Sequence, residues 1–262
     1  MMERNELKIK LEQLLAQMEK MGAECEPLIF EPPATENEVA EVERELGFKL
    51  PIEFRNVLLT ISKECRFRWE LPDSVVILYQ PMRELTEPVH RHMHSGELHW
   101  GIDLLLRYQK DIKDEWIKEV YFDPTDNYSK AWHNKLAFLT VDDNDSDYFA
   151  IDLSAENYGK IIYLCHDGDV YSNGCVIANS FNEFLENGLQ IAFSGGDSWE
   201  WDMFTHNRTS GIDPNCENAK IWREKSHSAA GPLRGTARHK PFPCGLYGKV
   251  YSSRLHRHWY ID

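Results

Sequence analysis

The sequence predicts an α+β protein in which a mixed, mostly antiparallel twisted sheet packs against helices. Three observations predict this class: two helices with clear start and stop signals near the N-terminus, three short apolar runs close together after residue 135, and a capped helix beyond them. A chain of 262 residues with 42% apolar content can also bury a sizeable core.

A short amphipathic helix is predicted over residues 5–22, where apolar residues recur among Lys and Glu and Gly22 supplies the stop. The prolines of residues 26–34 then predict an extended connector. Residues 1–34 are therefore expected to form a helical leader and connector, followed by a main domain over residues 35–224.

The stretch from Thr35 to Ser62 predicts two helices joined by an elbow. Thr35 and Glu38 are spaced as a capping box, and Gly47 stands where a left-handed helix end is needed. Pro51 suits the first turn of the second helix, where its missing N–H costs nothing. The apolar spacing predicts burial of Val39, Val42, Leu46, Leu50, Phe54, Val57, Leu58 and Ile61.

After the elbow, alternating residues predict strands over 66–71 and 75–79. Residues 82–102 have the least regular pattern of the main domain. Helical spacing predicts an amphipathic helix over 103–120, and the composition of 122–131 predicts a polar loop.

Three apolar runs over 136–141, 148–153 and 160–165 predict consecutive strands that pair as an antiparallel meander. Ser180 and Glu183 form a second capping box ahead of another helix. A last helix is expected over 215–224.

The elbow and these strands resemble the SUKH superfamily, which includes fungal regulators of cell-wall synthesis and bacterial immunity proteins that neutralise polymorphic toxins. The resemblance starts with the capped helix and its Leu-Gly, Leu-Pro and Phe-Arg pairs, and it extends from about Thr35 to Phe193. It implies a fold and a protein-binding role, and it offers no catalytic constellation. The residues that carry it are Leu46-Gly47, Leu50-Pro51, Phe54-Arg55, Trp132 to Phe138, Asp147 to Leu153, Lys160 to Tyr163 and Ser180 to Leu185.

The net charge of −14 is unevenly distributed. Residues 225–262 hold seven Lys/Arg and one acidic residue, a net charge of +6, which leaves −20 on residues 1–224. An acidic body repels nucleic acid and anionic membranes and attracts a basic protein. Acidity also keeps proteins soluble, so both interpretations stay open.

The pattern changes at Lys225. Residues 225–262 have several Gly and Pro, no sustained period and a reversed charge. This basic irregular tail either binds an anion or the acidic body, or is an appended, non-native segment; the second interpretation is favoured.

Two acidic turns are the predicted partner-binding surface, because turns at one end of a sheet are exposed and free of packing duties. The first turn resembles the start of a calcium-binding loop, but Tyr148 stands where the loop needs Gly and Ser154 where it needs Glu. The candidate residues are Asp142, Asp143, Asp145 and Asp147 in the first turn and Asp167 and Asp169 in the second.

A histidine-rich stretch gives the one metal candidate. His90, His92 and His94 alternate, with His99 close by, so their imidazoles would share a strand face. No neighbouring Cys or acidic pair completes a four-ligand site, and a polar loop is the favoured interpretation. We therefore expect no cofactor.

Other signals narrow the function classes. The six cysteines are scattered, without a CxxC pair. The sequence also shows no apolar run near 18 residues and no signal peptide. These features predict a cytoplasmic protein. No GxSxG, HExxH, P-loop or GxGxxG motif is present, and His166, Asp167 and Asp169 are interpreted as an ordinary strand-end turn, so no enzyme activity is expected.

The resemblance implies a non-catalytic protein-binding module, most simply an immunity protein that occludes a basic toxin such as a nuclease. The alternative is a regulatory scaffold in a signalling or cell-wall pathway, and a metal-dependent enzyme built on the histidines is the third hypothesis. The partner is expected to be a protein rather than nucleic acid or a membrane.

Overall fold

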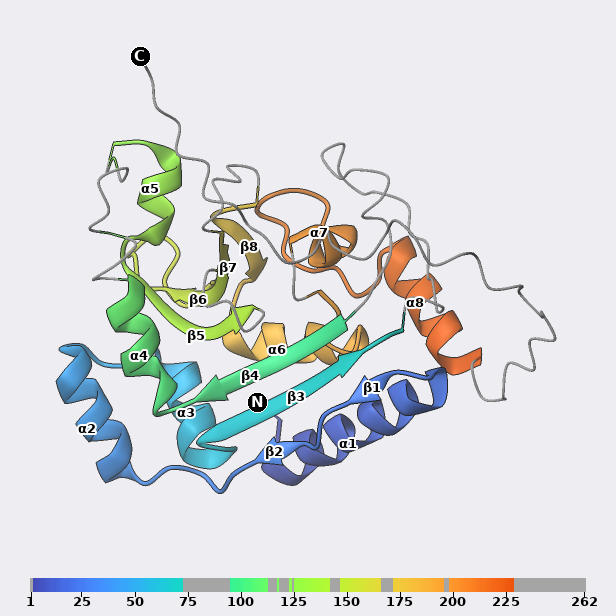
Figure 1. Cartoon of the computed structure of the whole chain (residues 1–262). Helices are drawn as coiled ribbons and strands as arrows, with labels where there is room; N and C mark the ends of the chain where they lie inside the picture. The colour runs from blue at the N-terminus through green and yellow to red at the C-terminus, as the bar shows by residue number, and fades with distance from the viewer. Residues whose placement is uncertain are drawn as a thin grey trace, which may run out of the picture. The chain divides into compact units, whose positions relative to one another are not determined.

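Two antiparallel sheets form the framework of the computed structural model, which describes residues 2–72, 95–112, 117, 123, 125–141, 147–165, 172–195 and 198–228. In the first sheet, β3 (Glu64–Glu70) pairs on one side with β4 (Ser95–Gly101) and on the other with the short strands β1 (Glu24–Cys25) and β2 (Ile29–Phe30). The second sheet runs β5 (Lys135–Val141), β6 (Asp147–Asp152), β7 (Ile161–Leu164) and β8 (Cys175–Ala178) in sequence order (Figure 1). The predicted α+β class and the antiparallel meander are confirmed, with the strands divided between two sheets.

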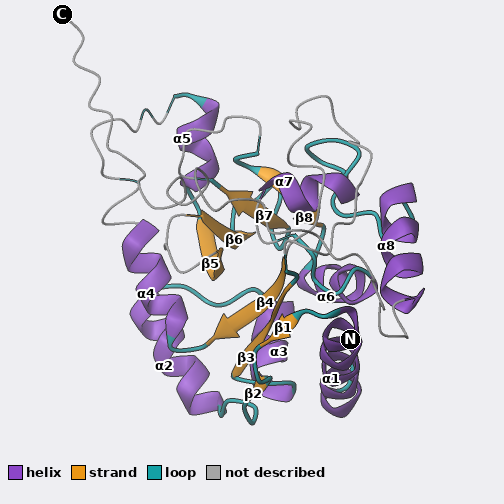
Figure 2. Ribbon diagram, turned by 45° about the vertical axis from the view of Figure 1, so that its right-hand side comes forward, coloured by secondary structure: helices purple, strands orange, loops and turns teal. Residues whose placement is uncertain are grey.

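The helices lie around these sheets (Figure 2), and among the described residues none is long and apolar enough to cross a membrane. They are α1 (Arg4–Met21), α2 (Glu36–Leu46), α3 (Ile52–Thr60), α4 (Leu104–Asp111), α5 (Asn127–Trp132), α6 (Phe181–Gln190), α7 (Ser198–Trp201), the 3₁₀ helix η3 (Asp202–Phe204) and α8 (Glu217–Ser228).

The predicted elbow forms as expected. The Thr35 hydroxyl accepts a hydrogen bond from the Glu38 amide at 3.2 Å, and the Glu38 carboxylate accepts one from the Thr35 amide at 2.7 Å. Gly47 ends α2 with a φ of 80°, a conformation that residues with a Cβ adopt at a cost. Leu50 and Phe54 are buried where α2 and α3 meet.

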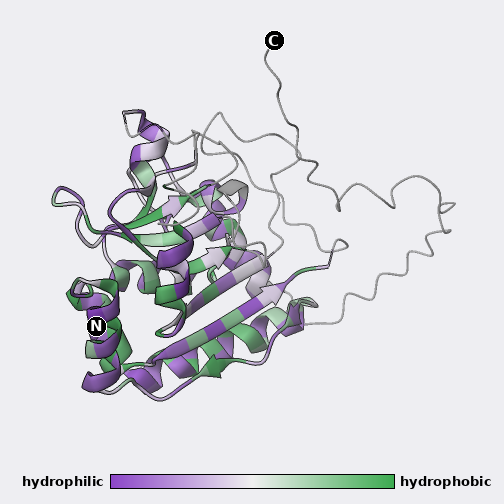
Figure 3. Ribbon diagram, turned by 60° about the vertical axis from the view of Figure 1, so that its left-hand side comes forward, coloured by the Kyte–Doolittle hydropathy of each residue, from purple (hydrophilic) through white to green (hydrophobic). Residues whose placement is uncertain are grey.

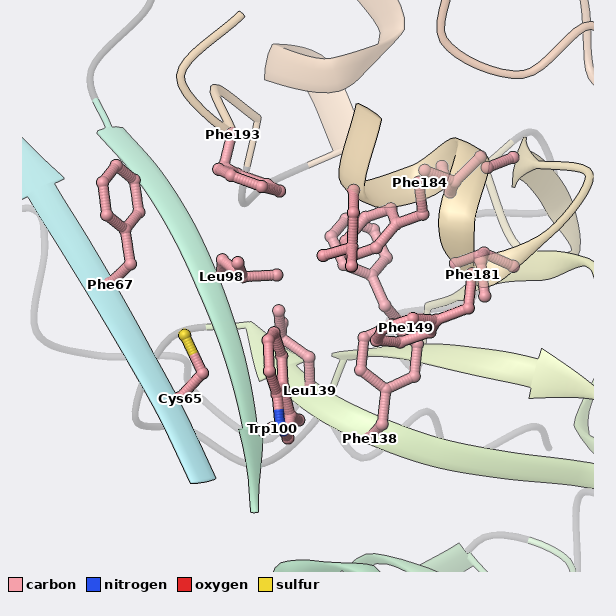
Figure 4. Close-up of a cluster of buried hydrophobic side chains, with 14 of the residues drawn as sticks. Cys65, Phe67, Leu98, Trp100, Phe138, Leu139, Phe149, Phe181, Phe184 and Phe193 are labelled. Carbon is pink, nitrogen blue, oxygen red and sulfur yellow. The ribbon is translucent and has the colours of Figure 1, made fainter. Parts of the chain in front are cut away.

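One hydrophobic core joins both sheets (Figure 4). Phe67 and Trp100 contribute from the first sheet, Phe138 from the second, and Phe181 from α6. The first and last described helices also contribute to this core, through the buried leucines of α1 and through Trp222 of α8.

A second, smaller core covers the other face of the second sheet. Tyr108 of α4 and Trp132 of α5 pack there around Tyr148 of β6. The second sheet is thus buried on both faces, and every residue of its strands is buried. The first sheet fully buries one face only, so half-buried and buried residues alternate along β3 and β4. The hydropathy colours alternate along the same long strands (Figure 3).

Several elements differ from the prediction. The short strand β1 precedes the connector and β2 lies within it. The irregular stretch ends in β4, most of α5 lies in the predicted polar loop, and β8 was not predicted. The short strands and α5 are too brief for periodicity to show. Glycines at both ends of β4 weaken its strand signal; Gly96 is required there, because a Cβ would lie 2.4 Å from Nε1 of the Trp69 indole.

The end of the last helix was also predicted wrongly. α8 continues past Glu224 to Ser228, and Ser226 is buried. The predicted tail boundary at residue 225 therefore lies within a helix, whereas residues 229–262 lie outside the described part of the chain. The strand expected over 75–79 is also outside it, as are most residues predicted to be helical beyond Ile112.

Candidate functional site

The candidate site lies at one end of the second sheet. Val141 at the end of β5 pairs with Asp147 at the start of β6, and Tyr148 pairs with Leu164 near the end of β7. The next ladder pairs Tyr163 of β7 with the first residue of β8. The residues that flank both predicted acidic turns are therefore at the same end of the sheet.

Most of the predicted site residues lie outside the described part of the chain. They are Asp142, Asp143, Asp145, His166, Asp167 and Asp169 in the two turns, and His90, His92 and His94 before β4. Their roles stay predictions.

Asp147 is described, and its surroundings differ from the exposed turn that was expected. It is the first residue of β6, only 9% exposed, and its Oδ2 accepts a hydrogen bond from the Tyr163 hydroxyl at 2.7 Å. Because a buried carboxylate needs such a donor, Asp147 has a structural role at the base of the turn. For this turn, the prediction of a partner-binding surface therefore depends on Asp142, Asp143 and Asp145, which lie outside the described residues.

The base of the second turn is held by side chains. The Cys165 amide donates to Oδ1 of Asn173 at 3.1 Å, and the Cys165 carbonyl accepts from the Tyr128 hydroxyl at 2.7 Å. Asn173, which is buried, also donates through Nδ2 to the Tyr128 carbonyl at 2.9 Å. These bonds connect α5 to the ends of β7 and β8.

A pocket of about 430 Å³ opens beside this base. Arg208 reaches it from the turn after η3, and its Nη2 donates to the Asn173 carbonyl at 2.6 Å. Asp126 caps α5, and hydrogen bonds from the amide and hydroxyl of Ser129 hold the pKa of its carboxyl below the usual value. The pocket is lined by Asp126, Asn127, Tyr128, Asn173 and Arg208.

These lining residues combine a carboxylate, two carboxamides, a guanidinium and an aromatic ring, a combination suited to recognising a polar protein surface. Sequence reasoning missed them, since they come from three separate segments. One local signal was present: Asp126 followed three residues later by Ser129 is the spacing of a helix cap.

His99, the described member of the histidine group, lies on β4. Burial, reinforced by the positive charges of Arg66 and Arg107, lowers the pKa of His99 to about 4, so its imidazole is neutral at pH 7. Within the described ranges, no group of three or more His, Cys, Asp or Glu side chains is placed to hold a metal ion.

The comparisons with known proteins identify the fold. The family model described as SMI1 / KNR4 family (SUKH-1) matches residues 33–187, which is more than half of the chain. The chain therefore belongs to this family, and the resemblance noted in the sequence is confirmed. Membership indicates an immunity or regulatory role exercised by binding a protein. A search of curated proteins found no match.

Proposed function

We propose that this protein is an immunity protein that neutralises a basic toxin by binding it directly through the acidic end of the second sheet. The observation that carries the proposal is that the flanks of both acidic turns lie at the same end of one sheet. Six aspartates belong to these two segments, on a body with a net charge of −20 over residues 1–224.

Charge complementarity supports a basic partner. Nuclease toxins bind phosphates and are therefore basic, and an acidic inhibitor covers that surface as a mimic. Charged turns raise the association rate, since they steer the partner before contact. The pocket beside Tyr128 then offers a site that a partner side chain can fill.

The test uses the polypeptide encoded beside this gene. We expect it to be toxic when expressed alone, harmless when this chain is co-expressed, and bound by it in solution. A neighbouring polypeptide that is harmless and does not bind would contradict immunity and favour the regulatory scaffold instead.

The role of the turns is tested by replacing Asp142, Asp143 and Asp145 with Asn, with Asp147 kept because it is buried. We expect association to slow by about tenfold at low salt and to lose much of its salt dependence. The matched control removes three exposed carboxylates from α1, α2 and α8, at Glu19, Glu45 and Glu224, by changing them to Gln. Equal slowing in both variants would show that net charge, rather than this end of the sheet, steers the partner.

A further inference from the structure

The pocket beside Tyr128 contains an exposed carboxylate whose bonding partners are neutral. Oδ1 of Asp126 accepts from the Ser129 amide at 2.9 Å, and Oδ2 accepts from the Ser129 hydroxyl at 2.7 Å. These bonds lower the pKa of Asp126, and the charge of Lys130 is the weakest of the effects on it. Asp126 is therefore ionised at pH 7, and within the described residues no ion pair neutralises it.

The pocket wall adds an aromatic ring and a carboxamide. The Tyr128 hydroxyl donates to the Cys165 carbonyl at 2.7 Å, which fixes the ring in the wall. The exposed side chain of Asn127 also lines the pocket, and no described residue forms a hydrogen bond with its carboxamide. The volume of about 430 Å³ is within the range of small-ligand sites.

Arg208 supplies the positive charge of the lining, and the chain itself holds it. Its Nη2 donates to the Asn173 carbonyl at 2.6 Å, and its own carbonyl accepts from the Val176 amide at 2.8 Å. In the part of the chain that the structure describes, no ion pair joins Arg208 to Asp126. Arg208 thus braces the pocket against β8 and leaves the Asp126 carboxylate available to a ligand.

We propose that this pocket binds an arginine side chain of the protein partner, with the guanidinium on the carboxylate of Asp126 and on Oδ1 of Asn127, alongside the Tyr128 ring. A guanidinium is planar, carries five N–H donors, and binds carboxylates and aromatic rings together. It is also less strongly hydrated than an ammonium group, which favours its entry into a partly enclosed pocket. The assignment rests on the proposed function, since a basic partner supplies the arginine.

The test uses the full chain and Nα-acetyl-arginine amide, with binding followed by NMR at the Ser129 amide, which donates to Asp126. Wild type should bind this probe with a millimolar Kd. Nα-acetyl-lysine amide carries the same charge and should bind about fivefold more weakly, because an ammonium group has no planar fork to match the carboxylate. Equal binding of the two probes would overturn the proposal, because it would reflect only the attraction of a cation to an acidic protein.

Asp126→Asn removes the charge but keeps a side chain that caps α5, so the fold should be preserved. It should weaken arginine binding by about tenfold, since a charge-assisted pair is lost. The matched control is Asp123→Asn. Asp123 accepts from the Thr125 amide and hydroxyl, at 2.7 and 2.6 Å, but does not line the pocket. Equal losses in the two variants would contradict binding in the pocket.

Arg208→Gln tests the cationic wall. Glutamine can still donate to the Asn173 carbonyl, so arginine binding should be kept or strengthened by about twofold once the repelling charge is gone. Loss of binding in this variant would show that Arg208 itself holds the ligand and would overturn the assignment.

Free arginine separates the two sources of a guanidinium. Similar affinity for free and blocked arginine supports a side chain of a protein partner. Free arginine that binds about tenfold more tightly would show that the pocket also recognises the α-carboxylate, and would give the site to the free amino acid.

These measurements are independent of the immunity test. A neighbouring polypeptide that is harmless, beside a chain that binds blocked arginine, would remove the immunity role and keep the pocket. A chain that neutralises its neighbour but ignores blocked arginine would remove the pocket assignment alone.

Discussion

The two sheets give similar charged side chains very different environments. On the open face of the first sheet, Nε of Arg66 and Arg68 lies 3.1 and 3.8 Å from the carboxylate of Glu26, and the arginine side chains remain 34% and 22% exposed. On the doubly covered second sheet, Lys135 and Asp152 lie 3.2 Å apart, and their side chains are only 6% and 4% exposed.

The difference shows that the cost of a charge is set by what covers its face of the sheet. Burial lowers the pKa of Lys135, and the nearby Asp152 does not fully offset this effect. Removing one partner of the ion pair on the second sheet therefore leaves a buried unpaired charge, whereas the pairs on the first sheet keep partial contact with water.

The largest expected effect comes from breaking the buried pair. Lys135→Met leaves the Asp152 carboxylate buried without its cation and should lower the free energy of unfolding by about 3–5 kcal/mol, measured by urea denaturation. Lys135→Met/Asp152→Leu should recover most of that loss, because no charge is left unpaired. If the double variant is as unstable as the single one, packing rather than charge explains the cost.

Measuring the unfolding free energy against pH tests whether the first sheet, although it is less buried, also buries a titratable group, His99. The pKa of His99 falls from 6.5 to about 4 on folding, so between these values the unfolded chain binds a proton that the folded chain does not. Stability should therefore fall as the pH drops through this window, by at most about 3.4 kcal/mol at about 1.36 kcal/mol per pKa unit.

His99→Gln is the matched variant for that titration. It should flatten the curve of unfolding free energy between about pH 6.5 and 5.5, which lies above the pKa values of most carboxylates. Identical curves for wild type and His99→Gln would show that the face of the first sheet leaves this imidazole solvated.

A smaller effect is expected at the base of the first acidic turn. Tyr163→Phe removes the hydroxyl that donates to the buried Asp147 and should cost about 1–3 kcal/mol in unfolding free energy. Tyr158→Phe, on a side chain that is 55% exposed, should cost below about 0.5 kcal/mol. Equal costs would mean that the second sheet does not penalise a lost donor more than the surface does.

The smallest effect should come from the first sheet's open face. Arg68→Met removes one partner of a half-exposed pair and should cost less than about 1 kcal/mol, with the difference shrinking as salt is added. A loss as large as that of Lys135→Met would end the contrast between the two sheets.

The sequence could predict those elements whose signals are local. The elbow depends on the Thr35–Glu38 capping box, the left-handed Gly47 and Pro51, all within one stretch, and it formed as predicted. β4 was missed, because its place is set by pairing with β3 and by the contact of Gly96 with Trp69 across strands. Such contacts leave no periodic trace in a single segment.

In the candidate site, too, local signals were predicted from the sequence and contacts between distant residues were not. That both turns attach to one end of the sheet follows from an antiparallel meander, which the sequence predicted. The burial of Asp147 depends on Tyr163, and the pocket depends on hydrogen bonds between Tyr128, Asn173 and Arg208, which are distant in sequence. Only the folded chain brings these groups together.

The position of α1 has a consequence for how the protein is made. This first helix packs against α6 and α8, and its Leu7, Leu11 and Met18 are completely buried in the folded protein. α8 begins about 200 residues after α1 ends, so a ribosome working at about 5–20 residues per second exposes that apolar face for about 10–40 s before its last partner emerges. During synthesis the leading helix is thus a natural target for chaperones.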